Sequence, residues 1–240
     1  GARPVAEIMH VDFIGCCFDI VLNQMSKMCY KTNGKLTVPM VLRTQGGRGK
    51  SNGCTQSQSL ESLFTHIPGL KVVMPATPKD AKGLLKSAIR DNNPVMFVEH
   101  KGLYQTKGEV PEEEYLIPIG KADVKREGKD VTIISYSKSV LMALDAAKEL
   151  EKQGINAEVL DLRSLVPLDF EAISQSVTKT GRVVIVHEAV ERSGYGAEIA
   201  AQIADKLFDE LDAPILRVCG CNIPVPNATL PELESAPTVE

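Results

Sequence analysis

The strongest indication of chemistry in the sequence is a group of glycines between two apolar segments. They are Gly46, Gly47, Gly49 and Gly53. Glycine permits positive φ and a close approach of the backbone to a ligand. The apolar run at 38–42 predicts a strand before the glycines, and helical apolar spacing over 60–67 predicts a helix after them. Open α/β sheets bind ligands at the carboxyl ends of their strands, so we expect a ligand-lining loop here.

The same loop contains Gly49-Lys50-Ser51, which resembles the end of the phosphate-binding motif G-x-x-x-x-G-K-[ST]. The first glycine of that motif falls on Thr44, and Asn52-Gly53 interrupts the position where the phosphate-binding helix begins. We therefore reject a nucleotide-binding P-loop. A purely structural turn stays open as the alternative to a ligand-lining loop.

Composition excludes several classes of protein. The chain has 240 residues, of which 43% are hydrophobic and 24% are charged, as is typical of globular proteins with one large domain or two smaller ones. A formal net charge of −4, with Lys and Arg dispersed, argues against a nucleic-acid partner. No apolar run approaches the roughly 18 residues of a membrane span, so we expect no membrane partner.

The cysteines lack the paired spacing of a zinc site. They are Cys16, Cys17, Cys29, Cys54, Cys219 and Cys221. Cys219-Gly220-Cys221 is one residue short of a C-x-x-C redox pair, and free cysteines commonly behave as small hydrophobic residues. We expect reduced thiols, which are typical of the bacterial cytoplasm or an organellar matrix.

Apolar periodicity along the chain predicts alternating strands and helices. In the first half we expect strands at 3–9, 38–42, 70–74 and 95–98, and helices at 12–30, 60–67 and 77–89. In the second half we expect strands at 131–135, 157–160, 183–186 and 215–218, and helices at 139–153, 169–177 and 197–207. This alternation predicts an α/β protein with two α/β domains and mainly parallel sheets. The proline- and glutamate-rich segment at 108–120 predicts a linker between them.

Several long segments resemble one enzyme family. These segments include RPVAEIMHVDF, VPMVLRT, PGLKVVMPATPKDAKGLLKSAIRDNNPV and LDLRSLVPLD. They resemble the beta subunit of the thiamine-diphosphate-dependent first component of 2-oxoacid dehydrogenases. GCCFDIVLNQ and EHKGLYQTKGEVPEE most resemble the acetoin dehydrogenase branch, with pyruvate dehydrogenase next. The resemblance covers nearly the whole chain, and from it we expect the natural protein to begin earlier.

The resemblance implies a domain organisation and a set of partners. It implies a transketolase-like pyrimidine-binding domain at 1–107, a linker at 108–125 and a transketolase C-terminal-type domain at 126–240. An alpha subunit would hold the diphosphate and magnesium of thiamine diphosphate, while this chain holds the aminopyrimidine. The implied assembly is an alpha2beta2 heterotetramer that works with a lipoyl acyltransferase core. The implied reaction cleaves acetoin or a 2-oxo acid such as pyruvate and transfers the acyl group to lipoyl.

The resemblance also assigns two site residues. Phe13 matches the family's aromatic residue against the pyrimidine, with a buried core phenylalanine as the alternative. Gln56 stands where the family has its active-site histidine, because Thr55-Gln56-Ser57-Gln58 replaces Gln-His-Ser-Gln. Glutamine can hydrogen-bond an oxyanion but cannot exchange a proton near pH 7. The family's pyrimidine-activating glutamate falls upstream of Arg3, outside this sequence.

These departures keep a second function open. A non-catalytic assembly or scaffold homologue, or a fragment, would retain the family's contacts without its chemistry. We expect no turnover from this chain alone. The histidines do not offer an obvious replacement for the family's residue, because they lie at the ends of predicted strands or helices, where structural histidines are common. They are His10, His66, His100 and His187.

The end of the helix predicted at 77–89 is a candidate metal site. Terminal helix carbonyls lack intrahelical partners and carry the negative end of the helix dipole, which suits a cation with oxygen ligands. Related beta subunits hold a potassium ion at this place, and Ala88, Asp91 and Asn93 match its ligands. An ordinary Asp-Asn helix stop is the alternative.

Overall fold

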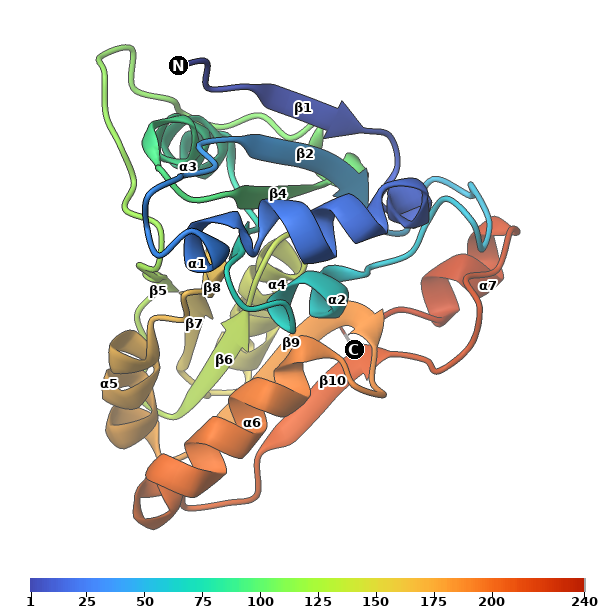
Figure 1. Cartoon of the computed structure of the whole chain (residues 1–240). Helices are drawn as coiled ribbons and strands as arrows, with labels where there is room; N and C mark the ends of the chain where they lie inside the picture. Colours follow the sequence, from blue (N-terminus) through green and yellow to red (C-terminus); the bar gives the residue numbers. More distant parts are fainter. Residues whose placement is uncertain (240) are drawn as a thin grey trace.

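The computed structural model describes residues 1–239 and contains two five-stranded sheets (Figure 1). The first has the order β1-β2-β4-β3-β8, with β1 (Val5–Ile8), β2 (Val41–Gly46), β3 (Lys71–Val73), β4 (Val95–His100) and β8 (Ser164–Val166). The second has the order β10-β9-β6-β7-β5, with β5 (Asp123–Arg126), β6 (Val131–Ser135), β7 (Ala157–Asp161), β9 (Val183–Val190) and β10 (Leu216–Gly220). All pairs are parallel except β3–β8 and β5–β7. The predicted α/β class with mainly parallel sheets is confirmed.

Two short antiparallel strands were not predicted. Strand β8 belongs to the second half of the chain but pairs with β3 of the first sheet, with Val72 opposite Val166. Strand β5 lies at the edge of the second sheet, with Val124 opposite Leu160. Each run is too short to show an apolar period, so its strand character depends on the neighbour it meets in the fold. Through β8 the second half of the chain extends the first sheet.

The single helix predicted at 12–30 is wrong. The segment forms a 3-10 helix η1 (Val11–Cys16), a π-helix η2 (Ile20–Met25) and a short α1 (Met28–Lys31). Asp12, which we expected to cap the helix, instead accepts hydrogen bonds from Gln58 at 2.9 Å (Nε2) and 3.2 Å (backbone N). Because the carboxylate binds the glycine-rich loop, it does not cap a continuous helix here.

The remaining helices cover the sheets. They are α2 (Glu61–Thr65), α3 (Pro78–Arg90), η3 (Lys101–Leu103), α4 (Ser139–Lys152), α5 (Phe170–Thr180), α6 (Tyr195–Lys206), η4 (Phe208–Glu210) and α7 (Thr229–Glu234). Helix α3 begins as predicted, because Thr77 Oγ1 accepts from the backbone N of Asp80 at 3.1 Å and Pro78 takes the first helical position. Helix α7 was not predicted. No helix in residues 1–239 is long and apolar enough to cross a membrane.

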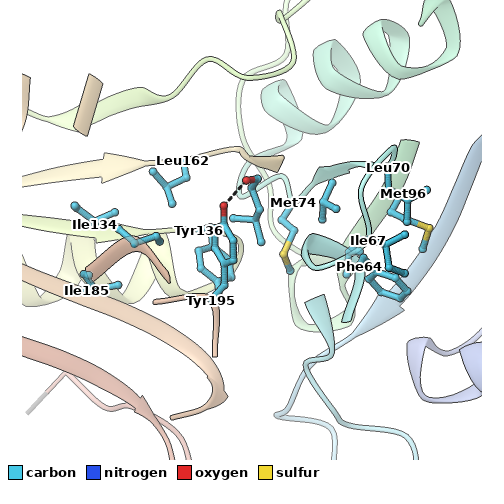
Figure 2. Packing of buried hydrophobic residues seen from close by; sticks show 14 of the residues in the cluster. Phe64, Ile67, Leu70, Met74, Met96, Ile134, Tyr136, Leu162, Ile185 and Tyr195 are labelled. Carbon is cyan, nitrogen blue, oxygen red and sulfur yellow. Dashed lines mark hydrogen bonds between the residues drawn. The ribbon is translucent and has the colours of Figure 1, made fainter. Parts of the chain in front are cut away.

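One hydrophobic cluster contains residues from both sheets. Figure 2 shows Phe64 and Met96 from the first half of the chain in the same cluster as Ile134, Ile185 and Tyr195 from the second. Burial of these large side chains stabilises each half against the other, at about 25 cal/mol for each Å² of apolar surface removed from water. This shared core holds the second sheet next to the loops at the carboxyl ends of the strands of the first sheet.

Candidate active site

The candidate residues lie at one edge of the first sheet. Strands β1, β2 and β4 are parallel neighbours, so their carboxyl ends meet at the same edge. Helix η1, which contains Phe13, follows β1. The glycine-rich loop, defined here as residues 46–60, follows β2, and Lys101 follows β4. The structure therefore brings together the two segments that hold Phe13 and Gln56.

Phe13 is an exposed aromatic residue at this edge. The residue is 39% exposed, so it is not a core phenylalanine. The ring lies 6.1 Å from the ring of His10, centroid to centroid, and is tilted by 60°. An exposed aromatic face at the carboxyl edge of a sheet is available for stacking on a flat ring.

A carboxylate joins the segment of Phe13 to the segment of Gln56. Asp12 Oδ1 accepts from Gln58 Nε2 at 2.9 Å and from the backbone N of Gln58 at 3.2 Å. Asp12 precedes Phe13 directly, and Gln58 follows Gln56 by two residues. The two predicted site residues thus lie on either side of one hydrogen-bonded contact. Gln56 itself is half-buried.

Lys101 holds the backbone of Gln56 from the end of β4. Its Nζ donates to the carbonyl oxygen of Gln56 and, at 3.2 Å, to Ser57 Oγ. The side chain is buried, with 7% of the residue exposed. Burial lowers the pKa of Lys101, while the nearby carboxylates of Asp12 and Glu232 oppose this shift. We did not predict Lys101 as a site residue, and its position directly after a buried strand was the available indication.

His100 and Glu188 hold the start of the same loop. The backbone N of Gly102 donates to His100 Nδ1 at 3.0 Å, so the proton lies on Nε2, which donates to the Glu188 carboxylate at 3.1 Å. Glu188 Oε1 also accepts from the backbone N of Arg48 at 2.7 Å. Burial raises the pKa of Glu188, but hydrogen bonds from His100 and Arg48 outweigh it and bring the pKa to about 2. Glu188 is therefore ionised near pH 7, and its carboxylate holds the backbone of the loop at Arg48.

Close packing at the start of the loop requires glycine. Gly47 has φ of +94°, and a Cβ at this position would lie 2.0 Å from His100 Nε2. A side chain would therefore have to displace the imidazole that binds Glu188. This contact, rather than phosphate binding, accounts for the glycine at this position.

Helix α7 of the second half also binds the loop. The backbone N of Ser51 donates to Glu232 Oε2 at 2.8 Å, and Ser51 Oγ lies 2.9 Å from Thr229 Oγ1. Arg48 Nη1 donates to Ser235 Oγ at 2.8 Å. These contacts were not predicted, because the sequence did not indicate α7 and the residues involved lie far apart in the chain.

A side chain from the first half of the chain enters the ligand position of the second sheet. Strands β6 and β9 are neighbours from which the chain continues to opposite sides, which is where α/β sheets commonly bind ligands. Glu61 of α2 enters this position and accepts from Tyr136 Oη at 2.8 Å. Glu61 is 1% exposed, and burial raises its pKa. A side chain of the first half thus occupies part of this position, whereas the carboxyl edge of the first sheet holds the predicted residues Phe13 and Gln56 and is the better candidate for a ligand.

The pair formed by Cys219 and His187 is not a nucleophilic dyad. Cys219 Sγ lies 3.3 Å from His187 Nε2. Burial raises the pKa of Cys219 to about 11 and lowers the pKa of His187 to about 4. Both groups are therefore neutral near pH 7, whereas a nucleophilic cysteine needs a thiolate. All the cysteines predicted as reduced are free thiols.

The predicted cation site at the end of α3 lies among positively charged side chains. Arg3 Nη1 donates to the carbonyl oxygens of Asp91 at 2.8 Å and Ile89 at 3.2 Å. Lys71 Nζ pairs with the Asp91 carboxylate, whose other oxygen accepts from the backbone N of Asn93 at 2.8 Å. The oxygens at this helix end therefore converge on a cation, which is the guanidinium of Arg3. Within residues 1–239, no group of three or more His, Cys, Asp and Glu has the arrangement of a metal site.

Comparison with known proteins identifies the family. The chain matches the transketolase pyrimidine binding domain over residues 1–107 and the transketolase C-terminal domain over 120–238. It is 53% identical over 238 residues to the acetoin:2,6-dichlorophenolindophenol oxidoreductase subunit beta of Bacillus subtilis, covering 99% of this chain and 70% of the relative. The chain belongs to the beta-subunit family of thiamine-diphosphate-dependent dehydrogenase first (E1) components.

Other relatives of this E1 beta subunit differ in their substrates. It is 50% identical over 226 residues to the pyruvate dehydrogenase E1 component subunit beta of Porphyra purpurea, covering 94% of this chain and 68% of that one. It is 46% identical over 241 residues to the 2-oxoisovalerate dehydrogenase subunit beta of B. subtilis, covering 100% and 72%. The predicted resemblance to acetoin and pyruvate dehydrogenase beta subunits is confirmed, and these relatives are subunits of oxidoreductases.

A solved structure supports the fold of the E1 beta subunit. A split-gene transketolase, described as an inactive beta4 tetramer, aligns with a TM-score of 0.81 and 25% identity. The alignment covers 100% of this chain and 73% of that one. The predicted transketolase-like architecture is confirmed.

Proposed function

We propose that this E1 beta subunit binds the aminopyrimidine of thiamine diphosphate at the carboxyl edge of its first sheet. The observation that carries this proposal is the exposed ring of Phe13, connected through Asp12 and Gln58 to the loop of Gln56. Phe13 suits the flat pyrimidine, because aromatic rings stack with an offset on one another. No P-loop motif was found, and the described residues provide no carboxylate cluster for magnesium. We assign the diphosphate and magnesium to an alpha subunit, within an alpha2beta2 heterotetramer.

The proposed reaction is the cleavage of acetoin or of a 2-oxo acid such as pyruvate, followed by transfer of the acyl group to the lipoyl arm of an acyltransferase core. When bound, thiamine diphosphate supplies the carbanion chemistry of that cleavage. Residues of this chain stack against the pyrimidine and orient the loop. Gln56 can donate a hydrogen bond to an oxyanion, but a proton near pH 7 must come from elsewhere.

A second candidate function is supported by Gln56. A homologue that assembles with an alpha subunit and the acyltransferase core without catalysis would not need the family's histidine. Loss of a general acid–base residue typically costs about a hundred- to ten-thousandfold in rate. The two functions differ in whether an assembled complex turns over.

The experiment is a turnover assay of this chain assembled with an alpha subunit, magnesium and thiamine diphosphate. Acetoin and pyruvate are supplied in parallel, with lipoylated acyltransferase as the acceptor. We expect thiamine-dependent acyl transfer from at least one substrate, and none from the chain alone. Assembly and cofactor binding without any turnover would support the assembly function instead.

We further propose that the oxygens at the end of α3, around Ala88, Asp91 and Asn93, bind potassium. The convergence of the Ile89 and Asp91 carbonyl oxygens on Arg3 supports this, because the same oxygens suit a monovalent cation. Potassium would have to replace the guanidinium of Arg3. Melting curves in equal concentrations of KCl and NaCl test the site: a higher melting temperature in KCl is expected, and identical curves would contradict it.

We propose the bacterial cytoplasm or an organellar matrix as the location of this enzyme. Bacterial relatives and the mitochondrial pyruvate dehydrogenase E1 component subunit beta of Caenorhabditis elegans, at 44% identity, support both settings. Free thiols suit either compartment.

A further inference from the structure

We propose that Lys101 is a positioning residue that fixes the backbone of Gln56 and thereby sets the direction of its side chain at the active site. The inference rests on the proposed function of that edge. In the described part of the chain, Lys101 Nζ has its hydrogen bonds on the loop itself, with the Gln56 carbonyl oxygen and, at 3.2 Å, with Ser57 Oγ. A backbone contact at Gln56 acts on the residue in the position of the family's histidine.

The burial of Lys101 indicates a specific role. The residue is 7% exposed, and lysine is almost never buried without compensation. Carboxylates of Asp12, Glu188 and Glu232 lie near enough to stabilise the ammonium group. Each of these acids also accepts a hydrogen bond from the glycine-rich loop, at Gln58, Arg48 and Ser51 respectively. Lys101 therefore lies in a group of charges whose acidic members each bind the glycine-rich loop.

Consecutive residues at the end of β4 hold the loop at two separate places. His100, through Glu188, holds the backbone N of Arg48 near the start of the loop. Lys101 holds Gln56 near its end. Because β4 pairs with β2 in register, with His100 opposite Gly46, both contacts begin from a rigid strand. Loss of Lys101 should release Gln56 while the attachment at Arg48 stays in place.

The test compares Lys101→Met with a matched control. Methionine keeps most of the length of lysine but removes the donors and the charge. Lys82→Met is the control, because Lys82 of α3 also donates to backbone carbonyls, those of Pro111 and, at 3.2 Å, Glu113, away from the loop. Hydrogen exchange of the chain is measured for peptides that cover 50–58. We expect exchange at least about tenfold faster in Lys101→Met and unchanged in Lys82→Met, whereas equal protection in all three proteins would overturn the proposal.

Kinetics of the assembled complex separate positioning from general stability. A misplaced group can cost up to about a hundredfold in rate, so we expect kcat to fall roughly ten- to a hundredfold in Lys101→Met with little change in KM. In a Gln56→Ala background the same substitution should have almost no further effect on kcat, because the side chain whose direction Lys101 sets is gone although the backbone carbonyl remains. A full additional loss in that background would show that Lys101 acts by another route and would overturn the proposal.

Two further results are provided for in the test of Lys101: a variant that does not fold and a wild-type complex that does not turn over. If Lys101→Met does not fold, as judged by circular dichroism, Lys101→Asn is used, because its amide keeps the buried position polar but is two bonds shorter than lysine and cannot take over the hydrogen bond to the Gln56 carbonyl oxygen. If the wild-type complex does not turn over, the proposed function fails, and the exchange measurement alone decides whether Lys101 holds the loop.

Discussion

His100 Nε2 donates to the carboxylate of Glu188 at 3.1 Å, and this bond links the end of β4 in the first sheet to β9 in the second. The same carboxylate accepts from the backbone N of Arg48 at 2.7 Å. A residue of the second half of the chain thus fixes the loop of the first half. The candidate site therefore depends on both halves, although its exposed edge belongs to one sheet.

Replacement of this carboxylate should destabilise the fold. Glu188→Ala leaves His100 Nε2 and the Arg48 backbone N without their acceptor, and each orphaned buried donor costs about 1–3 kcal/mol. For the two donors together, we expect the free energy of unfolding in urea to fall by roughly 2–6 kcal/mol. Glu198→Ala on the exposed face of α6 serves as the control and should stay within about 0.5 kcal/mol of wild type. Similar values for both variants would contradict the support assigned to Glu188.

Two causes can require glycine at position 47: its positive φ and the lack of space for a Cβ. A comparison of Gly47 with Gly34 separates them. Gly47 and Gly34 both have positive φ, +94° and +77°, but a Cβ at Gly34 would meet nothing within 4 Å. A Cβ at Gly47 would collide with His100. Both alanine variants carry the backbone strain of about 1–2 kcal/mol, and Gly47→Ala should lose roughly 2 kcal/mol more in urea unfolding. Equal losses would show that His100 is not in the way.

Stability should depend on pH through Asp161. This fully buried carboxyl lies beside Asp80, with Lys125 Nζ at 3.6 Å, and accepts from the backbone N of Arg163 at 3.0 Å. Burial raises its pKa to about 7, from about 3.9 in the unfolded chain. Between about pH 4 and 7 the folded state keeps a proton that the unfolded state has lost, so this group's contribution to stability falls as pH rises through that window.

Asp161→Asn removes that titration. The stability of the variant, relative to wild type, should therefore improve as pH rises from about 4 to 7 in urea unfolding. Asp145→Asn on the exposed face of α4 is the matched control and should follow the wild-type curve. Parallel pH profiles for Asp161→Asn and wild type would contradict the raised pKa.

Restoration of a histidine at position 56 should raise the acyl-transfer rate. Histidine titrates near neutral pH, whereas glutamine does not exchange a proton there. We expect Gln56→His in the assembled complex to increase lipoyl-dependent turnover by about tenfold or more. An unchanged or lower rate with normal assembly would mean that Gln56 is an adaptation of this chain. Thermal melting of both complexes provides the control for assembly.

The elements that sequence predicts well are those with strong local patterns. Strands such as β4 and β9 begin with four consecutive apolar residues, and α3 has the cap and proline of Thr77-Pro78. The broken segment after β1 was missed because Asp12 binds Gln58, a contact that apolar spacing does not reveal. Strands β5 and β8 depend on neighbours brought by the fold.

The same distinction applies to the site. Phe13 and Gln56 were assigned from motif resemblance, because each residue matches a defined position of the family's motifs. Glu188 and Lys101 were not assigned, because Glu188 binds Arg48 from 140 residues away and Lys101 acts through a backbone carbonyl of Gln56. Interactions of this kind leave no spacing pattern in a single sequence.

The most direct test of the central claim is a calorimetric titration of thiamine diphosphate and magnesium into this chain assembled with an alpha subunit. We expect saturable binding that weakens about two- to tenfold in Phe13→Leu, because an aromatic pair contributes about 0.5–1.5 kcal/mol beyond area burial. Phe208→Leu, at a more exposed ring in η4 (73% against 39% for Phe13), should bind like wild type. Absence of binding by the wild-type complex, or equal affinity of Phe13→Leu and wild type, would contradict the account.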